Sequence, residues 1–240
     1  MFQHILCACI QTGRNLLMKP VLRVLLYPNT AMQSEVARNL LKIRAVKLSP
    51  REPFTWASGL LSPIYCDNRV ALSYPEVRTF LKKCLAEKSA AFGAFDVVAG
   101  VATAGIPHGV LLADLLEKPF IYVRSSAKEH GRRNQIEGSL QPGQKVLVIE
   151  DLISTGGSCL MAVDALRDAA AEVVGVLAIF QYGFDKAKRA FKDKGVDFQT
   201  LTNYDALVKE AIHTGYVSQE DLQTLSEWRE NPDGWGALYV

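Results

Sequence analysis

Residues 146–158, VLVIEDLISTGGS, constrain the fold of this chain more than any other stretch. Apolar residues run into an acidic pair, Glu150 and Asp151, and then into a loop of Ser, Thr and Gly that opens a helical pattern. This order predicts a buried strand that carries polar groups at its carboxyl end. In open α/β sheets, ligands bind outside the carboxyl ends of the strands, and a following helix N-terminus favours an anion. Two carboxylates before such a loop suit a phosphorylated sugar, because they can accept hydrogen bonds from its hydroxyls.

Strand and helix patterns alternate around this stretch. Apolar runs predict strands at residues 97–100, 120–123, 146–149, 173–179 and 197–201, and amphipathic runs predict helices at residues 107–116, 158–171, 186–194 and 204–212. Nearly continuous apolar strands separated by helices are typical of a parallel sheet covered on both faces. A helix from residue 33, two β-like runs at 54–57 and 64–66, and a helix at 74–91 predict a small α+β layer before the sheet. A polar helix at 218–230, opened by a capping box, completes the pattern.

The amino-acid composition limits which binding partners and which cellular compartment we expect for this protein. A formal net charge of +2 gives no global reason to expect a nucleic acid or a membrane as partner. No stretch reaches the roughly 18 apolar residues of a transmembrane helix. The cysteines are odd in number, scattered and without a C-x-x-C pair, which favours free thiols in a cytoplasmic location over a zinc site. We expect residues 1–31 to be a poorly ordered extension, with a targeting segment as the alternative, and residues 32–240 to form a single domain.

Two further loops belong to the same predicted sheet edge. Residues 99–109, AGVATAGIPHG, could line an anion site through exposed N–H groups, although a plain strand-to-helix turn explains them equally well; we expect His108 on the helix surface. Residues 124–144 form a long connection that begins with a strongly basic segment. Loops of this length are usually functional, so we interpret this one as a lid over an anionic substrate. A solvated, charged hairpin remains the alternative.

Three stretches resemble known enzymes. VLVIEDLISTGGS resembles the PRPP-binding motif of type I phosphoribosyltransferases. FTWASGLLSPIYCDNR, residues 54–69, resembles the N-terminal hood of orotate phosphoribosyltransferases, and RSSAKEHG, residues 124–131, resembles their catalytic loop, R-x-x-x-K-x-H-G. The resemblance implies the type I phosphoribosyltransferase fold, an α/β fold with a parallel sheet, flanking helices and a small α+β hood. Its parts would be a hood at residues 32–72, a core at 73–215 and a C-terminal helix at 216–240.

The resemblance also implies a role for each matching residue. Glu150 and Asp151 would bind the ribose hydroxyls of PRPP, and residues 101–105 would form a pyrophosphate loop. The orotate pocket would contain Ser154, Tyr65 and Cys66. The catalytic residues would be Asp151 and the basic loop residues Arg124, Lys128 and His130, which also meet the pyrophosphate. The full set of PRPP-binding residues would be Arg124, Lys128, His130, Glu150, Asp151, Leu152, Ile153, Ser154, Thr155, Gly156, Gly157 and Ser158.

The implied reaction is transfer of the phosphoribosyl group from PRPP to orotate, which gives orotidine 5'-phosphate and pyrophosphate in pyrimidine biosynthesis. Mg²⁺ would be held mainly through PRPP, near Glu150 and Asp151, without direct protein ligation. The basic loop would reach the neighbouring subunit of a homodimer. The sequence departs from the enterobacterial enzymes at Ala57, Ala104, Ser125 and Tyr182, where cationic residues are lost. A purine-base phosphoribosyltransferase and a non-catalytic PRPP-sensing regulator are the alternatives.

Overall fold

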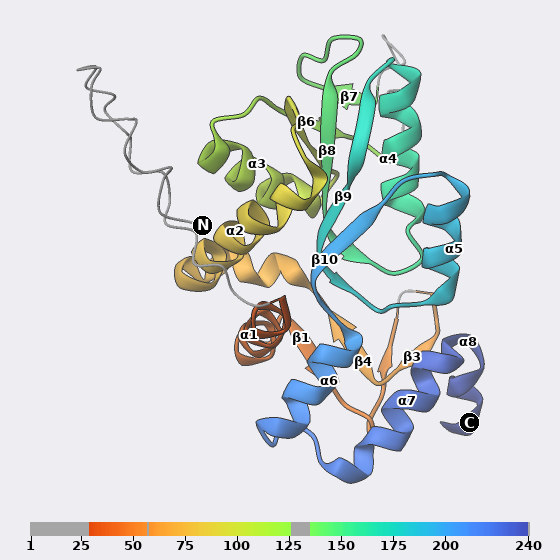
Figure 1. The fold of residues 1–240 in the computed structure, drawn as a ribbon. Helices are drawn as coiled ribbons and strands as arrows, with labels where there is room; N and C mark the ends of the chain where they lie inside the picture. Colours follow the sequence, from red (N-terminus) through yellow and green to blue (C-terminus); the bar gives the residue numbers. More distant parts are fainter. Residues whose placement is uncertain (1–28, 57, 126–134, 240) are drawn as a thin grey trace, which may run out of the picture.

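A six-stranded sheet forms the centre of the molecule in a computed structural model, which describes residues 29–239 apart from residue 57 and residues 126–134 (Figure 1). The order across the sheet is β10-β9-β8-β5-β6-β7. Neighbouring strands are parallel, except that the short edge strand β7 is antiparallel to β6. The strands are β5 (Val97–Val101), β6 (Phe120–Val123), β7 (Ile136–Glu137), β8 (Lys145–Ile153), β9 (Glu172–Gln181) and β10 (Phe198–Asn203).

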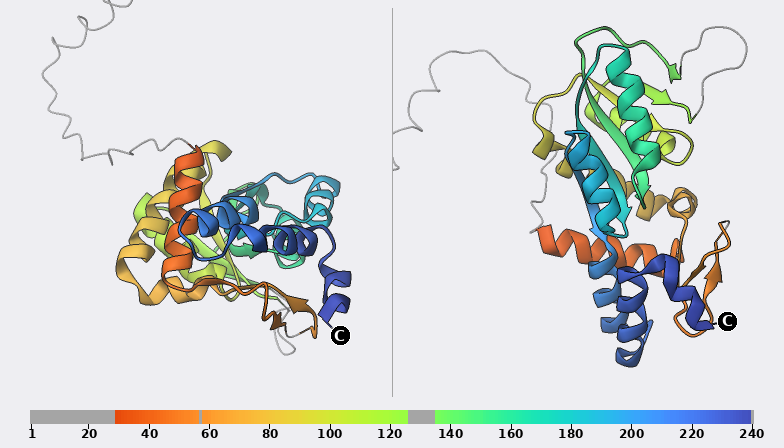
Figure 2. Two further views of the ribbon diagram at one scale, coloured as in Figure 1. Left: turned by 90° about the horizontal axis from the view of Figure 1, so that it is seen from below. Right: turned by 90° about the vertical axis from the view of Figure 1, so that its right-hand side faces the viewer.

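Alternating side chains give the sheet two buried faces. Along β8, Leu147 and Ile149 face one hydrophobic core, while Val146 and Val148 face the other. The first core is completed by α1 (Asn29–Lys42), α2 (Pro75–Ser89), α3 (Gly105–Leu116) and α6 (Tyr204–His213). The second is completed by α4 (Gly157–Asp168) and α5 (Asp185–Asp193), which cover the face seen in the right-hand view of Figure 2. The predicted parallel sheet with flanking helices is therefore confirmed.

A small hood lies at one end of the sheet. It contains two antiparallel strand pairs, β1 (Val46–Leu48) with β4 (Ile64–Cys66) and β2 (Phe54–Thr55) with β3 (Leu61–Ser62), followed by the 3-10 helix η1 (Asn68–Ser73). Helix α1 joins this hood to the core, because Thr202 of β10 donates to the Gln33 carbonyl at 2.9 Å. Arg38 also pairs with the buried Glu210 of α6 at 2.6 Å. These contacts fix the hood relative to the strand ends.

The C-terminal segment packs against the hood and the end of β9. Its elements are η3 (Gln219–Asp221), α7 (Leu222–Glu230), α8 (Pro232–Trp235) and η4 (Gly236–Tyr239). The predicted capping box is confirmed, since Ser218 and Asp221 exchange both capping hydrogen bonds. Trp228 of α7 is almost completely buried, with its ring centroid 5.6 Å from Tyr182 and 5.9 Å from Trp56. An aromatic cluster thus anchors α7 where the hood and sheet meet.

Several boundaries differ from the expectations. Strand β8 continues to Ile153, so the acid pair lies within the strand instead of following it; pairing with β9 extends this far. Helix α3 begins at Gly105, two residues earlier than expected, and β7 was not predicted because a two-residue strand has no periodicity to detect. Helix α1 begins at Asn29, and residues 1–28 of the expected extension lie outside the described residues. Within the described chain, no helix has the length and apolar character needed to cross a membrane.

Candidate active site

The site lies where the strand order of the sheet reverses. After β5 the chain moves to β6 on one side and then returns to β8 on the other. Such a switch point leaves a crevice at the carboxyl ends of the strands, which is the usual ligand site in open α/β sheets. Gly100 of β5 pairs with Ile149 of β8, and Val101 pairs with Val123 of β6. The acid pair, residues 101–105 and Arg124 therefore emerge along one edge of the sheet, as the sequence predicted.

Glu150 is a buried carboxyl with three polar contacts. One carboxylate oxygen accepts a hydrogen bond of 3.0 Å from the Asp151 backbone N–H. The other accepts from the Ser158 hydroxyl at 3.0 Å and lies 3.6 Å from the Cys159 thiol. Burial, together with the charge of Asp151, raises the pKa of Glu150 to about 8. Burial therefore favours the protonated form of Glu150 in the free protein.

Asp151 follows on the same strand and is partly exposed. Burial is the main reason that its pKa is raised, and the hydrogen bond from Glu150 and the charge of Arg69 act in the opposite direction. Its backbone carbonyl accepts a hydrogen bond of 2.8 Å from the Asn68 side chain in the hood. Two adjacent carboxyls with raised pKa values are a typical arrangement for a site that binds hydroxyl groups or a cation.

The loop after the acids has the geometry of an anion cradle. Gly156 adopts a φ of 84° as the N-cap of α4, and an added Cβ there would lie 2.6 Å from the Phe191 ring. Thr155 and Ser158 are exposed on this loop, at the N-terminus of a 12-residue helix. The unpaired N–H groups and the dipole of such a helix end favour a phosphate. Thr155, Gly157 and Ser158 of the predicted phosphate-binding segment are therefore exposed at the N-terminus of α4.

Gly105 allows the second loop to approach the acid pair. A side chain at this position would overlap the backbone carbonyl of Ile149 and would lie 3.2 Å from the Cα atom of Glu150. Helix α3 can begin directly against β8 only because residue 105 has no side chain. His108, on the first turn of α3, is 1% exposed, so the expectation of a surface position was wrong. Burial lowers the pKa of His108 to about 4, and its imidazole is neutral.

The hood supplies the other wall. Tyr65 is 40% exposed, with its ring centroid 5.8 Å from that of Phe54 and 5.9 Å from the Lys47 ammonium. Cys66 lies close enough to Asp151 for the carboxylate charge to raise its thiol pKa, in addition to the larger effect of burial. The two predicted base-pocket residues are thus on β4, and Cys66 is the nearer to the acid pair.

The basic loop is only partly described. Arg124 follows β6, where its backbone N–H donates to Gln135 at 2.9 Å and its guanidinium lies 3.7 Å from Glu137. Lys128 and His130, the other predicted loop residues, lie outside the described residues, as does Ala57. The sequence did not single out Asn68, because its contact with Asp151 joins segments that are far apart in the chain.

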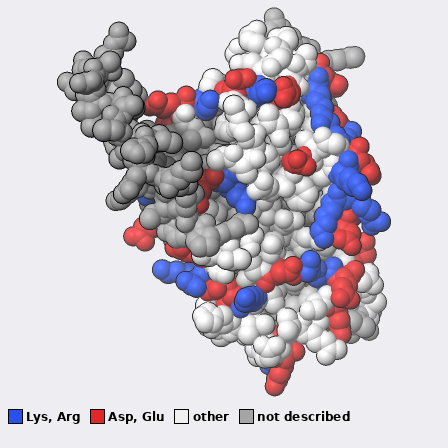
Figure 3. Space-filling model, viewed as in Figure 1, with Lys and Arg blue, Asp and Glu red and all other residues white. Residues whose placement is uncertain are grey.

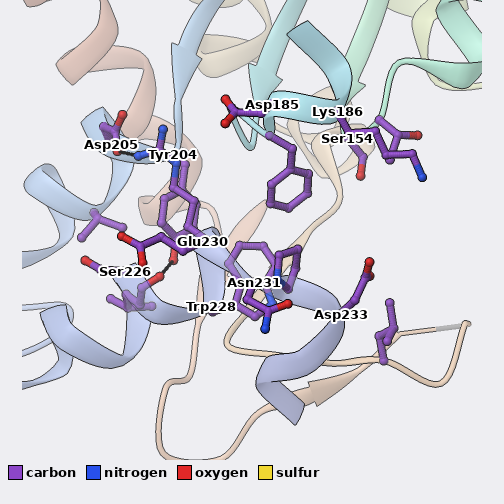
Figure 4. A pocket seen from close by; sticks show the side chains of 18 of the residues that line it. Ser154, Asp185, Lys186, Tyr204, Asp205, Ser226, Trp228, Glu230, Asn231 and Asp233 are labelled. Atoms are coloured by element: carbon purple, nitrogen blue, oxygen red, sulfur yellow. Dashed lines mark hydrogen bonds and ion pairs between the residues drawn. The ribbon is translucent and has the colours of Figure 1, made fainter. Parts of the chain in front are cut away.

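A cleft of about 1060 Å³ lies next to the phosphate loop. Its lining includes Ser154, Thr155 and Trp56, together with residues of the hood, α5, α6, α7 and α8. Figure 4 labels ten of the lining residues, among them Ser154 and Trp228. Glu150 and Asp151 are not part of its lining, whereas Ser154 and Thr155 of the phosphate loop are, so the cleft adjoins the acid pair through that loop. The acidic and basic side chains that line it are equal in number. Figure 3 shows that Lys, Arg, Asp and Glu are also mixed on the surface along the α4 and α5 edge.

The fold and the site together define a phosphoribosyltransferase, and residues 70–216 match the phosphoribosyl transferase domain family. The orotate phosphoribosyltransferase of Listeria monocytogenes serotype 4b is 58% identical over 207 residues, which is 86% of this chain and 99% of the relative. The chain belongs to the orotate phosphoribosyltransferase family.

Solved structures agree with this assignment. The Aeropyrum pernix orotate phosphoribosyltransferase is 29% identical, with a TM-score of 0.66 over 76% of this chain and 99% of that one. The Mycobacterium tuberculosis enzyme, in complex with 5-phospho-alpha-D-ribosyl 1-diphosphate (PRPP), is 27% identical, with a TM-score of 0.58 over 75% of this chain and 99% of that one.

Proposed function

We propose that this chain transfers the 5-phosphoribosyl group of PRPP to orotate and releases orotidine 5'-phosphate and pyrophosphate. One observation carries the proposal: the buried Glu150 and the adjacent Asp151 run directly into an exposed loop at a helix N-terminus. The acids suit vicinal ribose hydroxyls, and the helix end on the same segment suits the 5-phosphate. A relative that is 58% identical over 86% of the chain is named orotate phosphoribosyltransferase, which supports the proposal.

In the proposed complex, two parts of PRPP are bound by two different kinds of group: the ribose by the carboxyls and the 5-phosphate by the loop. Asp151 and Glu150 accept hydrogen bonds from the ribose hydroxyls. These hydrogen bonds replace those that the carboxylates would make to water if they were not buried. Ser154, Thr155 and Ser158 contribute hydroxyls around the 5-phosphate, and Gly156 and Gly157 let the backbone come close to it. The remaining residues of this segment, Leu152 and Ile153, hold the strand in the sheet and keep the loop in place.

Mg²⁺ fits this donor set as a partner of the substrate. Glu150 and Asp151 are two adjacent carboxyls whose pKa values burial raises, so a nearby cation would favour their charged forms. No cluster of three or more metal-binding side chains occurs in the described part of the chain. Mg²⁺ is commonly held by one or two carboxylates together with substrate phosphates. When bound, the ion would neutralise negative charge that develops on the pyrophosphate leaving group.

The chain's own residues complete the proposed reaction. Tyr65, Cys66 and Ser154 border the orotate. Its ring nitrogen gives up its proton to solvent and bonds to C1 of the ribose as the bond from C1 to pyrophosphate breaks. Arg124, Lys128 and His130 bind the departing pyrophosphate, and Lys128 or His130 donates a proton to it. Fixed positive groups stabilise this charge strongly when the site is closed to water. We propose that the loop reaches the active site of the partner in a homodimer.

The alternatives are less well supported. A purine-base enzyme is disfavoured, since the curated relatives at 54–58% identity are named as orotate enzymes. A PRPP-sensing regulator needs no group to meet a leaving pyrophosphate, whereas this chain carries Arg124, Lys128 and His130 in that loop. The free thiols of Cys66, Cys84 and Cys159 support a cytoplasmic location.

One assay separates these functions. The purified protein is incubated with Mg²⁺ and PRPP, together with orotate, adenine, hypoxanthine or no base, and pyrophosphate release is measured. We expect release only with orotate. Release with a purine would establish the purine enzyme instead, and PRPP binding without release under every condition would establish the regulator. Addition of EDTA should abolish release, and excess Mg²⁺ should restore it.

A further inference from the structure

Asn68 is a fully buried polar residue at the point where the hood meets the acid pair. Its Nδ2 group donates a hydrogen bond of 2.8 Å to the backbone carbonyl of Asp151, 83 residues further along the chain. The pairing of β5 with β8 ends at Gly100 and Ile149, before Asp151 is reached. A backbone carbonyl withdrawn from water needs a donor. The Asn68 amide therefore supplies a hydrogen bond at a position where β8 has lost its β5 neighbour.

The surroundings fix the orientation of this amide. Only the Nδ2 end can face a carbonyl oxygen, because the Oδ1 end would bring two acceptors together. The Oδ1 atom is consequently buried and has no hydrogen-bond partner in the part of the chain that the structure describes. A buried, unpaired acceptor is destabilising. The hydrogen bond that the amide donates to Asp151 is therefore offset by the unpaired acceptor at its other end.

The backbone on either side of Asn68 is also held. The Asp67 backbone N–H donates to the Ala45 carbonyl at 2.7 Å. The Asp67 carboxylate accepts two hydrogen bonds from the Arg69 guanidinium, at 2.6 and 2.9 Å, and one from the Arg69 backbone N–H at 3.1 Å. The Asp67 backbone is therefore tied to the residue before β1, and Arg69 is tied to Asp67. These bonds order the turn that presents the Asn68 amide to β8.

Two more elements of the site lie near the same residue. Burial raises the pKa of the Cys66 thiol on β4, and the nearby Asn68 side chain and backbone act in the opposite direction. Burial lowers the pKa of His108 on α3, and the nearby Asn68 backbone acts in the opposite direction. Asn68 thus lies beside the predicted base pocket, the strand that carries the acids, and the helix that follows the pyrophosphate loop.

We infer that Asn68 is a positioning residue that holds Asp151 in register with the hood, so that ribose and base are aligned; its catalytic consequence rests on the proposed function. The amide does not contact substrate and acts only through Asp151. Displacing a reacting group by about 1 Å commonly costs on the order of 100-fold in rate. Loss of the Asn68 hydrogen bond should therefore impair use of PRPP more than it impairs folding.

The test compares Asn68→Leu with a matched control, Asn39→Leu. The Asn39 side chain also donates to a backbone carbonyl, that of Glu35 at 2.9 Å, but it lies on α1. Steady-state rates are measured with PRPP and orotate varied separately, ribose 5-phosphate binding is measured by titration calorimetry, and Tm is recorded for each protein. Asn68→Ser, which adds no bulk to the core, serves as a second variant at the same position.

We expect both Asn68 variants to lose about 10- to 100-fold in kcat/KM for PRPP, with a smaller change in KM for orotate. Asn39→Leu should keep the original rates. A folded Asn68 variant with unchanged kcat/KM for PRPP would overturn the inference, and so would an equal loss in Asn39→Leu. If the unaltered protein shows no orotate-dependent release, the proposed function fails separately. Weaker ribose 5-phosphate binding by the Asn68 variants would then still support positioning, and equal binding would refute it.

Discussion

Replacing Glu150 with glutamine is expected to stabilise the free protein at alkaline pH and to weaken its binding of PRPP. Glu150 is 4% exposed, and its carboxyl pKa is raised from 4.5 to about 8 by burial and by the charge of Asp151. Glutamine has the same shape and can accept the hydrogen bond that the Asp151 N–H donates. Its Nε2 group can donate to the Ser158 hydroxyl. The substitution therefore removes the charge while it preserves the local hydrogen bonds.

The sign and size of the effect follow from proton linkage. Between pH 4.5 and about 8 the folded state of Glu150 binds more protons than the unfolded state does, so the free energy of unfolding falls as the pH rises. The contribution is complete below pH 4.5 and is lost by about pH 8. A shift of this size corresponds to on the order of 4 kcal/mol. In a chain of this length that amounts to a Tm difference of about 8–16 °C.

The measurement is thermal unfolding of the wild type and Glu150→Gln at several pH values from 5 to 9, without ligands. The two proteins should have similar Tm values at pH 5, and the variant should be clearly more stable at pH 8.5. Glu52→Gln is the control, because Glu52 is an exposed loop residue. A Tm difference that stays constant over the whole range would refute the reasoning, because it would mean that Glu150 is already charged in the folded protein.

Three other changes test the site and the core. Lys128→Ala should reduce turnover about 10²- to 10³-fold if Lys128 meets the pyrophosphate, whereas Lys192→Ala on the exposed face of α5 should leave the rate unchanged. Gly105→Ala should lower the free energy of unfolding by roughly 3 kcal/mol, because its methyl group overlaps the β8 backbone. Gly157→Ala, whose methyl group would meet only the Thr155 Oγ1 atom at 4.0 Å, should change it far less in the same urea titration. Trp228→Ala should cost about 3–5 kcal/mol, and an unchanged Tm would contradict the role of the aromatic cluster as an anchor.

The acid pair and its loop could be predicted because their chemistry lies in consecutive residues. Apolar residues before Glu150 specify a buried strand, and the small residues up to Ser158 specify a helix start that can bind an anion. Local patterns of this kind fix which groups emerge together at a strand end. They do not specify where the strand stops: β8 runs on to Ile153 because β9 pairs with it that far, and pairing is a tertiary property.

The contacts that align the site could not be predicted in the same way. Asn68 meets Asp151 across 83 residues, and nothing near either residue indicates that contact. His108 was expected on a helix surface, but it is 1% exposed on α3, a helix that begins against β8 at Gly105. Tyr182, where enterobacterial enzymes carry a cation, is only 3% exposed and packs 5.3 Å from the Phe184 ring centroid. Tyr182 is also packed against Trp228 of α7, an element that is distant from it in the sequence.

The two acids connect the stability of the fold with its proposed chemistry. The charge of Arg69 lowers the pKa of Asp151. Because Arg69 also forms an ion pair with Asp67, it neutralises the charge of Glu150 and Asp151 only in part. Burial therefore disfavours the charged forms of both carboxyls in the free protein. Substrate and Mg²⁺ would favour those forms, and binding should release protons near neutral pH. Calorimetry in buffers of different ionisation enthalpy should detect this release in the wild type, and the release should be smaller in Glu150→Gln.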